Sequence, residues 1–332
     1  MPKFVLTGAG GGIGSIAADY ALEIAQPNQK LLFTTTDLAK LPAGRVDGWK
    51  SKGAEVAEAN YNNPESLKKA FQGADTVAFI STWALGQRPQ QAANVIEAAK
   101  AAGVKRICYT SFIGAGLGND SEEARRRAVK TIPFLPQDHV ETERLIRSSG
   151  LQWNIQRDYL YQDNTAAFFS QSWKFCGDKW LNNTQGRKGA YVAREDCGRV
   201  FGALLMGKAV PNTCYTITGP EAVTDREVFD YINSVSGYKA DFVDVTDEEL
   251  AKWWRERGLP DDAINGDFSK LPMKLCIPDL LCCGEMVAQG HMEEVTDAVE
   301  GMTRGKRVDR EFKALCSLPQ RSHVLSSLLP VV

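Results

Sequence analysis

A run of glycines near the start of the chain has the residue types and the spacing of a phosphate-binding turn. Residues 3–14 read Lys-Phe-Val-Leu-Thr-Gly-Ala-Gly-Gly-Gly-Ile-Gly, so a short apolar strand runs directly into the glycines and a helical pattern follows. Glycine suits this turn because a Cβ would keep the backbone amides away from a diphosphate. Those amides and the positive helix end predict a site for the pyrophosphate of a dinucleotide. Its members are Gly8, Ala9, Gly10, Gly11, Gly12, Ile13 and Gly14.

A glycine pattern alone also occurs in ordinary tight turns, but its place after the first expected strand favours phosphate binding. No lysine follows the glycines, which excludes a Walker-type loop. Asp37 ends the second expected strand, where a carboxylate accepts hydrogen bonds from the adenosine ribose. Beside a 2′-phosphate it is repulsive by about 1 kcal/mol in water at 4 Å. Thr36-Asp37 therefore favours NAD(H) unless Lys40 or Arg45 folds back to compensate; the alternative for Asp37 is a turn or N-cap residue.

Strands and helices alternate through the first half of the chain. Strands are expected at residues 4–6, 30–35, 54–59, 76–81, 106–111 and 152–156, and helices at 15–27, 65–71, 89–102 and 139–149. Units of this length force parallel pairing with right-handed crossovers. The pattern predicts an α/β fold with a doubly wound parallel sheet, that is, a Rossmann domain over residues 1–160.

After about residue 160 the regular alternation loosens. Strands are expected at 214–218 and 241–245, and capping boxes open helices at residues 224 and 246. Residues 261–290 show a poor, proline-interrupted pattern, which we interpret as a lid or irregular cover. We therefore expect residues 161–332 to form a smaller α/β substrate domain, with strands that return to the main sheet.

Composition excludes several classes of partner. With 39 basic and 41 acidic residues the net charge is -2, which gives no electrostatic case for nucleic acid or an acidic membrane. Met1-Pro2-Lys3 leads straight into the first strand, which predicts no signal peptide, and the longest apolar runs are broken. The eight cysteines lack CxxC spacing, which favours a reducing, cytoplasmic location and no metal site.

Several further motifs occur in one order along the chain, and together they are far more specific than the glycines. They are Gly86-Gln87-Arg88, residues 94–100, residues 102–111, residues 139–143, residues 157–164 and Arg194-Glu195-Asp196. With these motifs the chain resembles the NmrA-like, atypical short-chain dehydrogenases/reductases, and among them the type 2 quinone oxidoreductases. The likeness covers residues 3–250. It implies a Rossmann domain, a small C-terminal substrate domain and NADP(H) in the cleft between them, although relatives carry arginine where Thr36 stands.

The same resemblance bears on the catalytic residues. Ser111 stands where ordinary short-chain dehydrogenases place their serine, but their Tyr-xxx-Lys pair is absent and His139 and Glu143 occupy its two slots. Glu143 cannot lower a neighbour's pKa as a lysine does, which argues against alcohol–ketone interconversion. A quinone accepts hydride readily, so a strong general acid is dispensable. His139 then either donates a proton, touches the nicotinamide ribose or amide, or is an ordinary helix-start histidine.

Other candidates follow the remaining strands at the carboxyl edge, where such sheets bind ligands. We expect Asn60, Ser81, Thr82, Trp83 and Gln87 to contact the cofactor, although Asn60 is equally suited to closing a turn. Tyr161 is a further catalytic candidate. An aromatic slot for a planar acceptor is expected from Trp83, Phe112, Tyr159, Tyr161, Phe168 and Trp173, with core packing as the alternative.

The leading functional hypothesis is an NAD(P)H-dependent oxidoreductase that passes a hydride to a quinone, enone or iminium-like acceptor. A redox-sensing NmrA-like regulator that binds the dinucleotide without turnover is one alternative. A reductase for one specialised metabolite is another, because residues 260–332 are unfamiliar and substrate lids vary with specificity. We expect a small planar organic substrate and a monomer or homodimer.

Overall fold

The computed structural model describes residues 1–84, 86–118, 134–164, 175–236, 239–262, 265–271 and 275–303. The described chain divides into two compact units. The first comprises Met1–Tyr159 and Arg194–Ile217 together with residues 296–303, and the second comprises Leu160–Ala193 and Thr218–Val295. The chain thus leaves the first unit after Tyr159 and returns to it twice. That the second unit binds the substrate stays a prediction.

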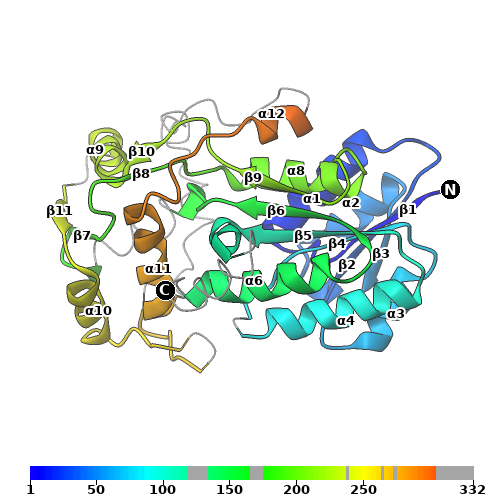
Figure 1. Cartoon of the computed structure of the whole chain (residues 1–332), viewed down its shortest axis with the longest axis horizontal. Coiled ribbons are helices and arrows are strands. Elements are labelled where there is room, and N and C mark those ends of the chain that lie inside the picture. Colours follow the sequence, from blue (N-terminus) through cyan, green and yellow to red (C-terminus); the bar gives the residue numbers. More distant parts are fainter. Residues whose placement is uncertain are drawn as a thin grey trace. The chain divides into compact units, whose positions relative to one another are not determined.

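The first unit is built on a seven-stranded sheet in the order β3-β2-β1-β4-β5-β6-β9 (Figure 1). Every neighbouring pair is parallel. The strands are β1 Lys3–Leu6, β2 Lys30–Thr35, β3 Glu55–Glu58, β4 Thr76–Phe79, β5 Arg106–Phe112, β6 Gln152–Asp158 and β9 Thr213–Ile217. The order reverses between β1 and β4, so the predicted doubly wound sheet is confirmed.

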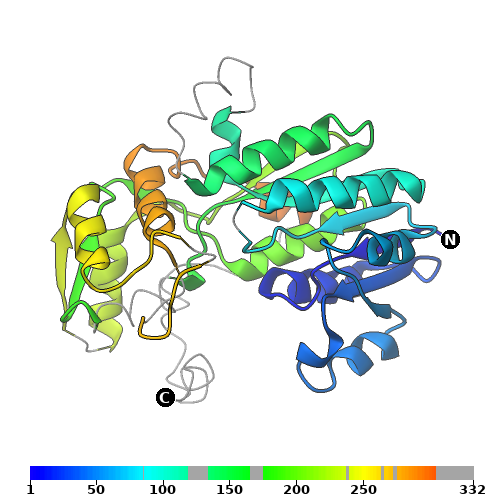
Figure 2. The same cartoon turned by 90° about the horizontal axis from the view of Figure 1, so that it is seen from below.

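Helices cover both faces of this sheet. On one face lie α1 (Gly12–Ile24) and α8 (Arg194–Leu205), and on the other α3 (Pro64–Phe71), α4 (Arg88–Ala101) and α6 (Phe134–Arg147). Figure 2 shows α4 and α6 side by side. The short helices of this unit are α2 Arg45–Ser51, α12 Ala298–Met302 and the 3-10 turns η1 Leu38–Lys40 and η2 Ile113–Gly118. The strand–helix pattern of the sequence does not predict α8.

The core of the first unit explains the apolar strands. Val5, Val77, Ile107 and Ile155 have no solvent exposure, because helices cover the sheet on both sides. The predicted start of α3 is also seen, since Asn63 accepts a hydrogen bond from the Ser66 amide and Pro64 follows it. The buried strands and the capped start of α3 thus position the carboxyl ends of the strands, next to which the site residues lie.

The described residues of the second unit form two small sheets and three helices. Strand β7 (Lys179–Asn182) pairs in parallel with β11 (Asp241–Asp244), and β8 (Lys188–Gly189) pairs antiparallel with β10 (Val223–Thr224). The helices are α9 Asp225–Ser236, α10 Asp247–Arg255 and α11 Ile277–Ala288. Both predicted capping boxes are present, at Thr224 with Glu227 and at Thr246 with Glu249.

One expectation for the second unit is wrong. Residues 261–290 include α11, a regular helix of 12 residues, instead of an irregular cover throughout. Pro278 lies in its first turn, where the missing N–H of proline costs no intrahelical bond. The proline therefore starts a helix that the sequence pattern treats as interrupted.

The helices of the described residues include none with both the length and the apolar character of a membrane span.

Candidate active site

The glycine turn is held between β1 and β2. The Ala9 amide donates to the Thr34 carbonyl at 2.9 Å, and the Gly11 amide donates to the Gly8 carbonyl at 3.1 Å. Gly8 has a φ of +71°, a conformation that glycine adopts at no steric cost. A Cβ at Gly14 would lie 2.0 Å from the Gly8 oxygen, so α1 packs against the turn only because Gly14 has no side chain. The motif glycines are thus required by the backbone itself.

The turn leaves several backbone amides available. In the described part of the chain the amides of Gly10, Gly12, Ile13 and Gly14 donate to no acceptor, and the N-cap residue Gly11 supplies no side-chain cap. Four free donors at the positive end of a helix form an anion site. The donor set fits a diphosphate.

A hollow of about 550 Å³ opens beside this turn. It is bounded by the turn, by the segments that follow β2, β3 and β4, and by the start of α4, so it lies where the strand order reverses. Eight residues predicted to bind the cofactor line it: Gly8, Gly10, Gly11, Thr36, Asn60, Ser81, Thr82 and Gln87. The other eight predicted residues do not line it: Ala9, Gly12, Ile13, Gly14, Asp37, Trp83, Ser111 and His139. The structure brings the eight together, and their contact with a cofactor stays a prediction.

Tyr61 also lines the hollow, and sequence reasoning missed its pairing with Thr7. Their hydroxyl oxygens lie 2.6 Å apart, and the Tyr61 hydroxyl is 3.0 Å from the Ile80 carbonyl oxygen. Burial raises the pKa of Tyr61 to about 12, so its hydroxyl stays protonated. Tyr61 directly follows Asn60, just after the third strand. This position beside a predicted cofactor contact was the sequence signal that could have identified it. Asn60 itself closes a turn by accepting from the Asn62 amide at 2.9 Å.

Asp37 lies at the rim and caps a short turn. Its Oδ1 accepts from the Ala39 amide at 2.9 Å, and its Oδ2 lies 3.6 Å from Lys40 Nζ. Lys40 lines the hollow, whereas Arg45 pairs with Asp19 in another part of the unit. Of the two compensating cations considered from the sequence, only Lys40 therefore lies at the hollow.

The loop that follows β4 is fixed by polar contacts. The Ser81 amide donates to Thr110 Oγ1 at 2.8 Å, and Thr82 Oγ1 donates to Gln91 Oε1 at 2.6 Å. Arg88 is buried and donates from Nε to the Thr82 carbonyl at 2.8 Å. These bonds hold the wall of the hollow that Ser81 and Thr82 form. Trp83 projects from the same loop and is 46% exposed.

The predicted catalytic residue Ser111 is engaged in a buried network. Its hydroxyl donates to Glu143 Oε1 at 2.7 Å. Arg157 donates to the same carboxylate from Nε at 2.9 Å and from Nη2 at 2.6 Å. Ser111 and Glu143 are buried, and both oxygens of the Glu143 carboxylate accept hydrogen bonds from these neighbours. Glu143 thus serves as the shared hydrogen-bond acceptor of Ser111 and Arg157.

His139 is buried on α6, next to a tyrosine on β5. Its Nδ1 lies 2.9 Å from the Tyr109 hydroxyl oxygen. Burial, together with the positive charge of Arg88, holds the pKa of His139 well below its ordinary value. The imidazole is therefore neutral at physiological pH and is a hydrogen-bonding group rather than a strong acid.

The predicted aromatic slot is only partly within the described chain. Phe112 and Tyr159 are buried in the first unit, which is what the core-packing alternative expects. Tyr161 belongs to the second unit, where it forms a parallel bridge with Val192. Phe168 and Trp173 lie outside the described residues. The slot stays a prediction.

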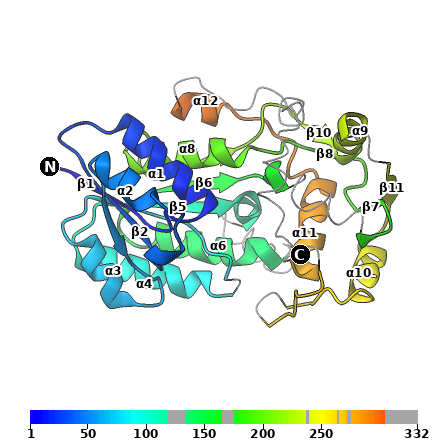
Figure 3. The ribbon, with the colours of Figure 1, turned by 180° about the vertical axis from the view of Figure 1, so that it is seen from behind.

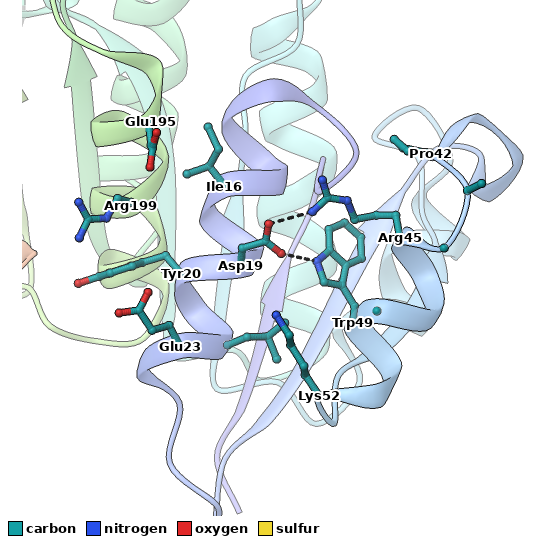
Figure 4. A pocket seen from close by; sticks show the side chains of 14 residues that line it. Ile16, Asp19, Tyr20, Glu23, Pro42, Arg45, Trp49, Lys52, Glu195 and Arg199 are labelled. Atoms are coloured by element: carbon teal, nitrogen blue, oxygen red, sulfur yellow. Dashed lines mark hydrogen bonds and ion pairs between the residues drawn. The ribbon is translucent and has the colours of Figure 1, made fainter. Parts of the chain in front are cut away.

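A second hollow, of about 950 Å³, lies over α1, α2 and α8 (Figure 4). Asp19 there accepts from Arg45 Nη1 and from Trp49 Nε1, both at 2.8 Å. Although larger, this hollow includes no residue of the glycine turn, and its central carboxylate, Asp19, is already paired. The smaller hollow, beside the glycine turn, is therefore the candidate site for the cofactor. No group of three potential metal ligands occurs in the described ranges.

A parallel sheet with a glycine turn at the reversal of its strand order defines a dinucleotide-binding domain of the oxidoreductase type. Comparison with known protein families supports this class of domain. A family model described as NAD(P)H-binding matches residues 8–205, so the chain belongs to this NAD(P)H-binding family. It is an NAD(P)H-dependent oxidoreductase, and the NmrA-like resemblance is confirmed.

Two curated relatives illustrate the family. An NmrA-like family domain-containing oxidoreductase of Aspergillus flavus is 27% identical over 252 residues, which cover 75% of this chain and 76% of that protein. Quinone oxidoreductase 2 of Escherichia coli is 26% identical over 257 residues, which cover 77% and 82%. Among solved structures, the Escherichia coli NADPH-dependent quinone oxidoreductase in complex with NADPH has a TM-score of 0.74 at 22% identity, covering 97% of this chain and 99% of that one. The structural match supports the fold.

Proposed function

We propose that this chain transfers a hydride from NAD(P)H to a planar acceptor of the quinone, enone or iminium type. Support comes from two curated relatives, the quinone oxidoreductase 2 of Escherichia coli and an NAD(P)H azoreductase of Xenophilus azovorans that is 24% identical over 265 residues. The nicotinamide supplies the hydride. The chain's own residues bind the diphosphate at the glycine turn and close the wall of the hollow around Tyr61 and Ser81.

The state of His139 and Glu143 carries this proposal. Glu143 accepts two hydrogen bonds from Arg157, and His139 is neutral and hydrogen-bonded to Tyr109. Neither side chain supplies the strongly acidic proton that reduction of an unactivated ketone needs. A quinone forms a stabilised anion after hydride transfer, and water or a neutral donor protonates it. The site therefore suits acceptors that are activated by their own electronic structure.

For the cofactor, we propose that Lys40 faces the 2′-phosphate of NADPH. Its ammonium group offsets the carboxylate of Asp37, which by itself favours the free hydroxyl of NADH. Because Lys40 is 80% exposed, water screens this contribution. We therefore expect both nucleotides to bind, with a modest preference for NADPH.

The decisive experiment follows the absorbance of NADPH and of NADH with a panel of quinones, an azo dye and simple aliphatic ketones. We expect oxidation with quinones and none with the ketones. Oxidation of ketones at comparable rates would contradict the proposal. Nucleotide binding without oxidation by any acceptor would instead favour the non-catalytic regulator, and a single accepted aromatic substrate would favour the specialised reductase.

A further inference from the structure

Two helices of the first unit are packed unusually closely. A Cβ at Gly198 of α8 would lie 2.6 Å from Ile16 Cβ, and one at Gly202 would lie 2.7 Å from the Ala17 carbonyl oxygen. The contact between α1 and α8 therefore depends on glycine at both positions. Gly198 meets Ile16 and Gly202 meets Ala17, so the two helices run in the same direction. Figure 3 shows them side by side.

This packing brings the first residue of α8 to the glycine turn. A Cβ at Gly12, the first residue of α1, would lie 3.2 Å from Arg194 Cδ and 3.9 Å from Arg194 Nε. The side chain of Arg194 therefore passes directly over Gly12, and it is half-buried there. Arginine at this place sets a permanent positive charge beside the free amides of the turn.

We propose that Arg194 binds the diphosphate bridge of the dinucleotide. A guanidinium group presents paired donors that match two phosphate oxygens, and it adds to the amides and to the positive end of α1. The contact is made to a part of the cofactor that NADH and NADPH share. The inference rests on the proposed position of the diphosphate at the glycine turn.

The acidic residues that follow Arg194 do not occupy the same place. Asp196 is buried and lies 4.0 Å from Arg199. Glu195 is exposed and lines the larger hollow with Arg199 (Figure 4). Arg194 is thus the charged side chain of α8 that lies against Gly12.

The test measures dissociation constants by calorimetry for Arg194→Gln and for the wild type. The ligands are NAD+, NADP+, ADP-ribose and adenosine 2′-monophosphate. We expect Arg194→Gln to weaken the first three by the same factor, about tenfold or more, which corresponds to about 1.4 kcal/mol. Adenosine 2′-monophosphate lacks the diphosphate, so its affinity should stay unchanged. Higher salt should weaken the wild type more than the variant.

Arg199→Gln is the matched control, because it removes the same charge from the same helix about 7.5 Å further along. We expect it to leave all four affinities within twofold. Thermal unfolding without ligand checks that both variants are folded, and Arg194→Lys, which keeps the charge but not the paired donors, should recover part of the loss.

Three results would overturn the proposal. They are unchanged affinities in Arg194→Gln, an equal loss in Arg199→Gln, and a loss that extends to adenosine 2′-monophosphate. If the wild type binds none of the nucleotides, the cofactor site itself is wrong and the proposal fails with it. If the wild type binds but oxidises no substrate, only the proposed reaction fails and the role of Arg194 is decided by the affinities.

Discussion

The carboxylate of Glu143 and the guanidinium of Arg157 face each other through two hydrogen bonds, from Nε to Oε1 and from Nη2 to Oε2. The pair joins α6 to β6, and the Glu143 side chain has no solvent exposure. A charge pair at this depth is costly to break, because the partner that remains is buried without compensation. Glu143 stands where ordinary short-chain dehydrogenases carry their catalytic lysine. In this chain it forms a buried ion pair with a structural role.

Glu143→Gln should therefore lower the free energy of unfolding by about 3–5 kcal/mol, because Arg157 keeps its charge in the interior. Urea unfolding measures this change. Glu141→Gln is the control on the same helix, since Glu141 pairs with Arg144 at the surface, and about 0–1 kcal/mol is expected there. Equal losses in the two variants would show that the Glu143–Arg157 pair is not set apart by burial.

His139 should make the protein less stable as the pH falls. Its folded pKa lies below the unfolded value of about 6.5, so below that pH the unfolded chain binds a proton that the native state does not. Stability is then complete above about pH 6.5 and is lost below it, by at most about 1.4 kcal/mol per pH unit. Urea titrations of the wild type and His139→Gln at pH 5 and pH 7 measure the difference.

Asp225 makes the comparison with the variant necessary. Burial raises its pKa to about 6, so this group adds stability as the pH falls through 6 and partly offsets His139 in the wild type. Removing His139 leaves the contribution of Asp225 in place. A wild type and a His139→Gln variant with the same dependence on pH would show that His139 titrates normally.

Lys40 should set the preference between the two nucleotides. Lys40→Gln is expected to weaken NADP+ by a few-fold and to leave NAD+ unchanged, because an exposed charge contributes about 1 kcal/mol or less. Asp37→Asn should strengthen NADP+, since it removes the negative charge 3.6 Å from Lys40 Nζ. Fluorescence titration with both nucleotides gives the ratios. A fall in NAD+ affinity equal to that in NADP+ would argue against a contact with the 2′-phosphate.

Asp138 should hold the loop that follows β4. Its Oδ2 accepts from the Gly86 amide at 2.5 Å and lies 3.3 Å from Arg88 Nη1, while Arg88 holds the Thr82 carbonyl. Asp138→Ala is therefore expected to speed hydrogen exchange in residues 81–88 and to weaken dinucleotide binding several-fold. Glu141→Ala, about one helical turn further along, should change neither. Unchanged exchange in Asp138→Ala would show that the loop is held by other contacts.

The doubly wound parallel sheet was predictable from the sequence, and the reasons are physical. Short apolar strands alternating with capped helices leave few arrangements, and the glycine turn marks the first crossover. Gly14 shows why the motif is informative. A Cβ at this position would collide with the Gly8 backbone, so the fold itself requires glycine there. Lys30–Thr35 agrees to the residue, since both of its ends are bounded by turn residues.

What the sequence did not reveal depends on contacts distant in the chain. The pairing of Tyr61 with Thr7, the ion pair of Glu143 with Arg157, and the approach of Arg194 to Gly12 each join separate elements. The pattern of residue types along the sequence does not say which distant residues touch in the fold. Helix α11 was missed for a local reason, because a proline in a first turn has the same appearance in a sequence as a helix breaker.

The central claim is that the glycine turn binds the diphosphate of NAD(P)H. Calorimetry of the wild type and of Gly10→Val tests it most directly, because Gly10 lines the hollow and a Cβ there would lie 2.9 Å from Leu41 Cδ2 and 3.0 Å from Thr35 Oγ1, two residues of its wall. Gly48→Ala, at an open position on α2, is the control. We predict one dinucleotide bound per wild-type chain, the same in Gly48→Ala and none in Gly10→Val. Wild-type protein that is folded and binds neither NADPH nor NADH, or a Gly10→Val variant that binds them normally, would contradict the account.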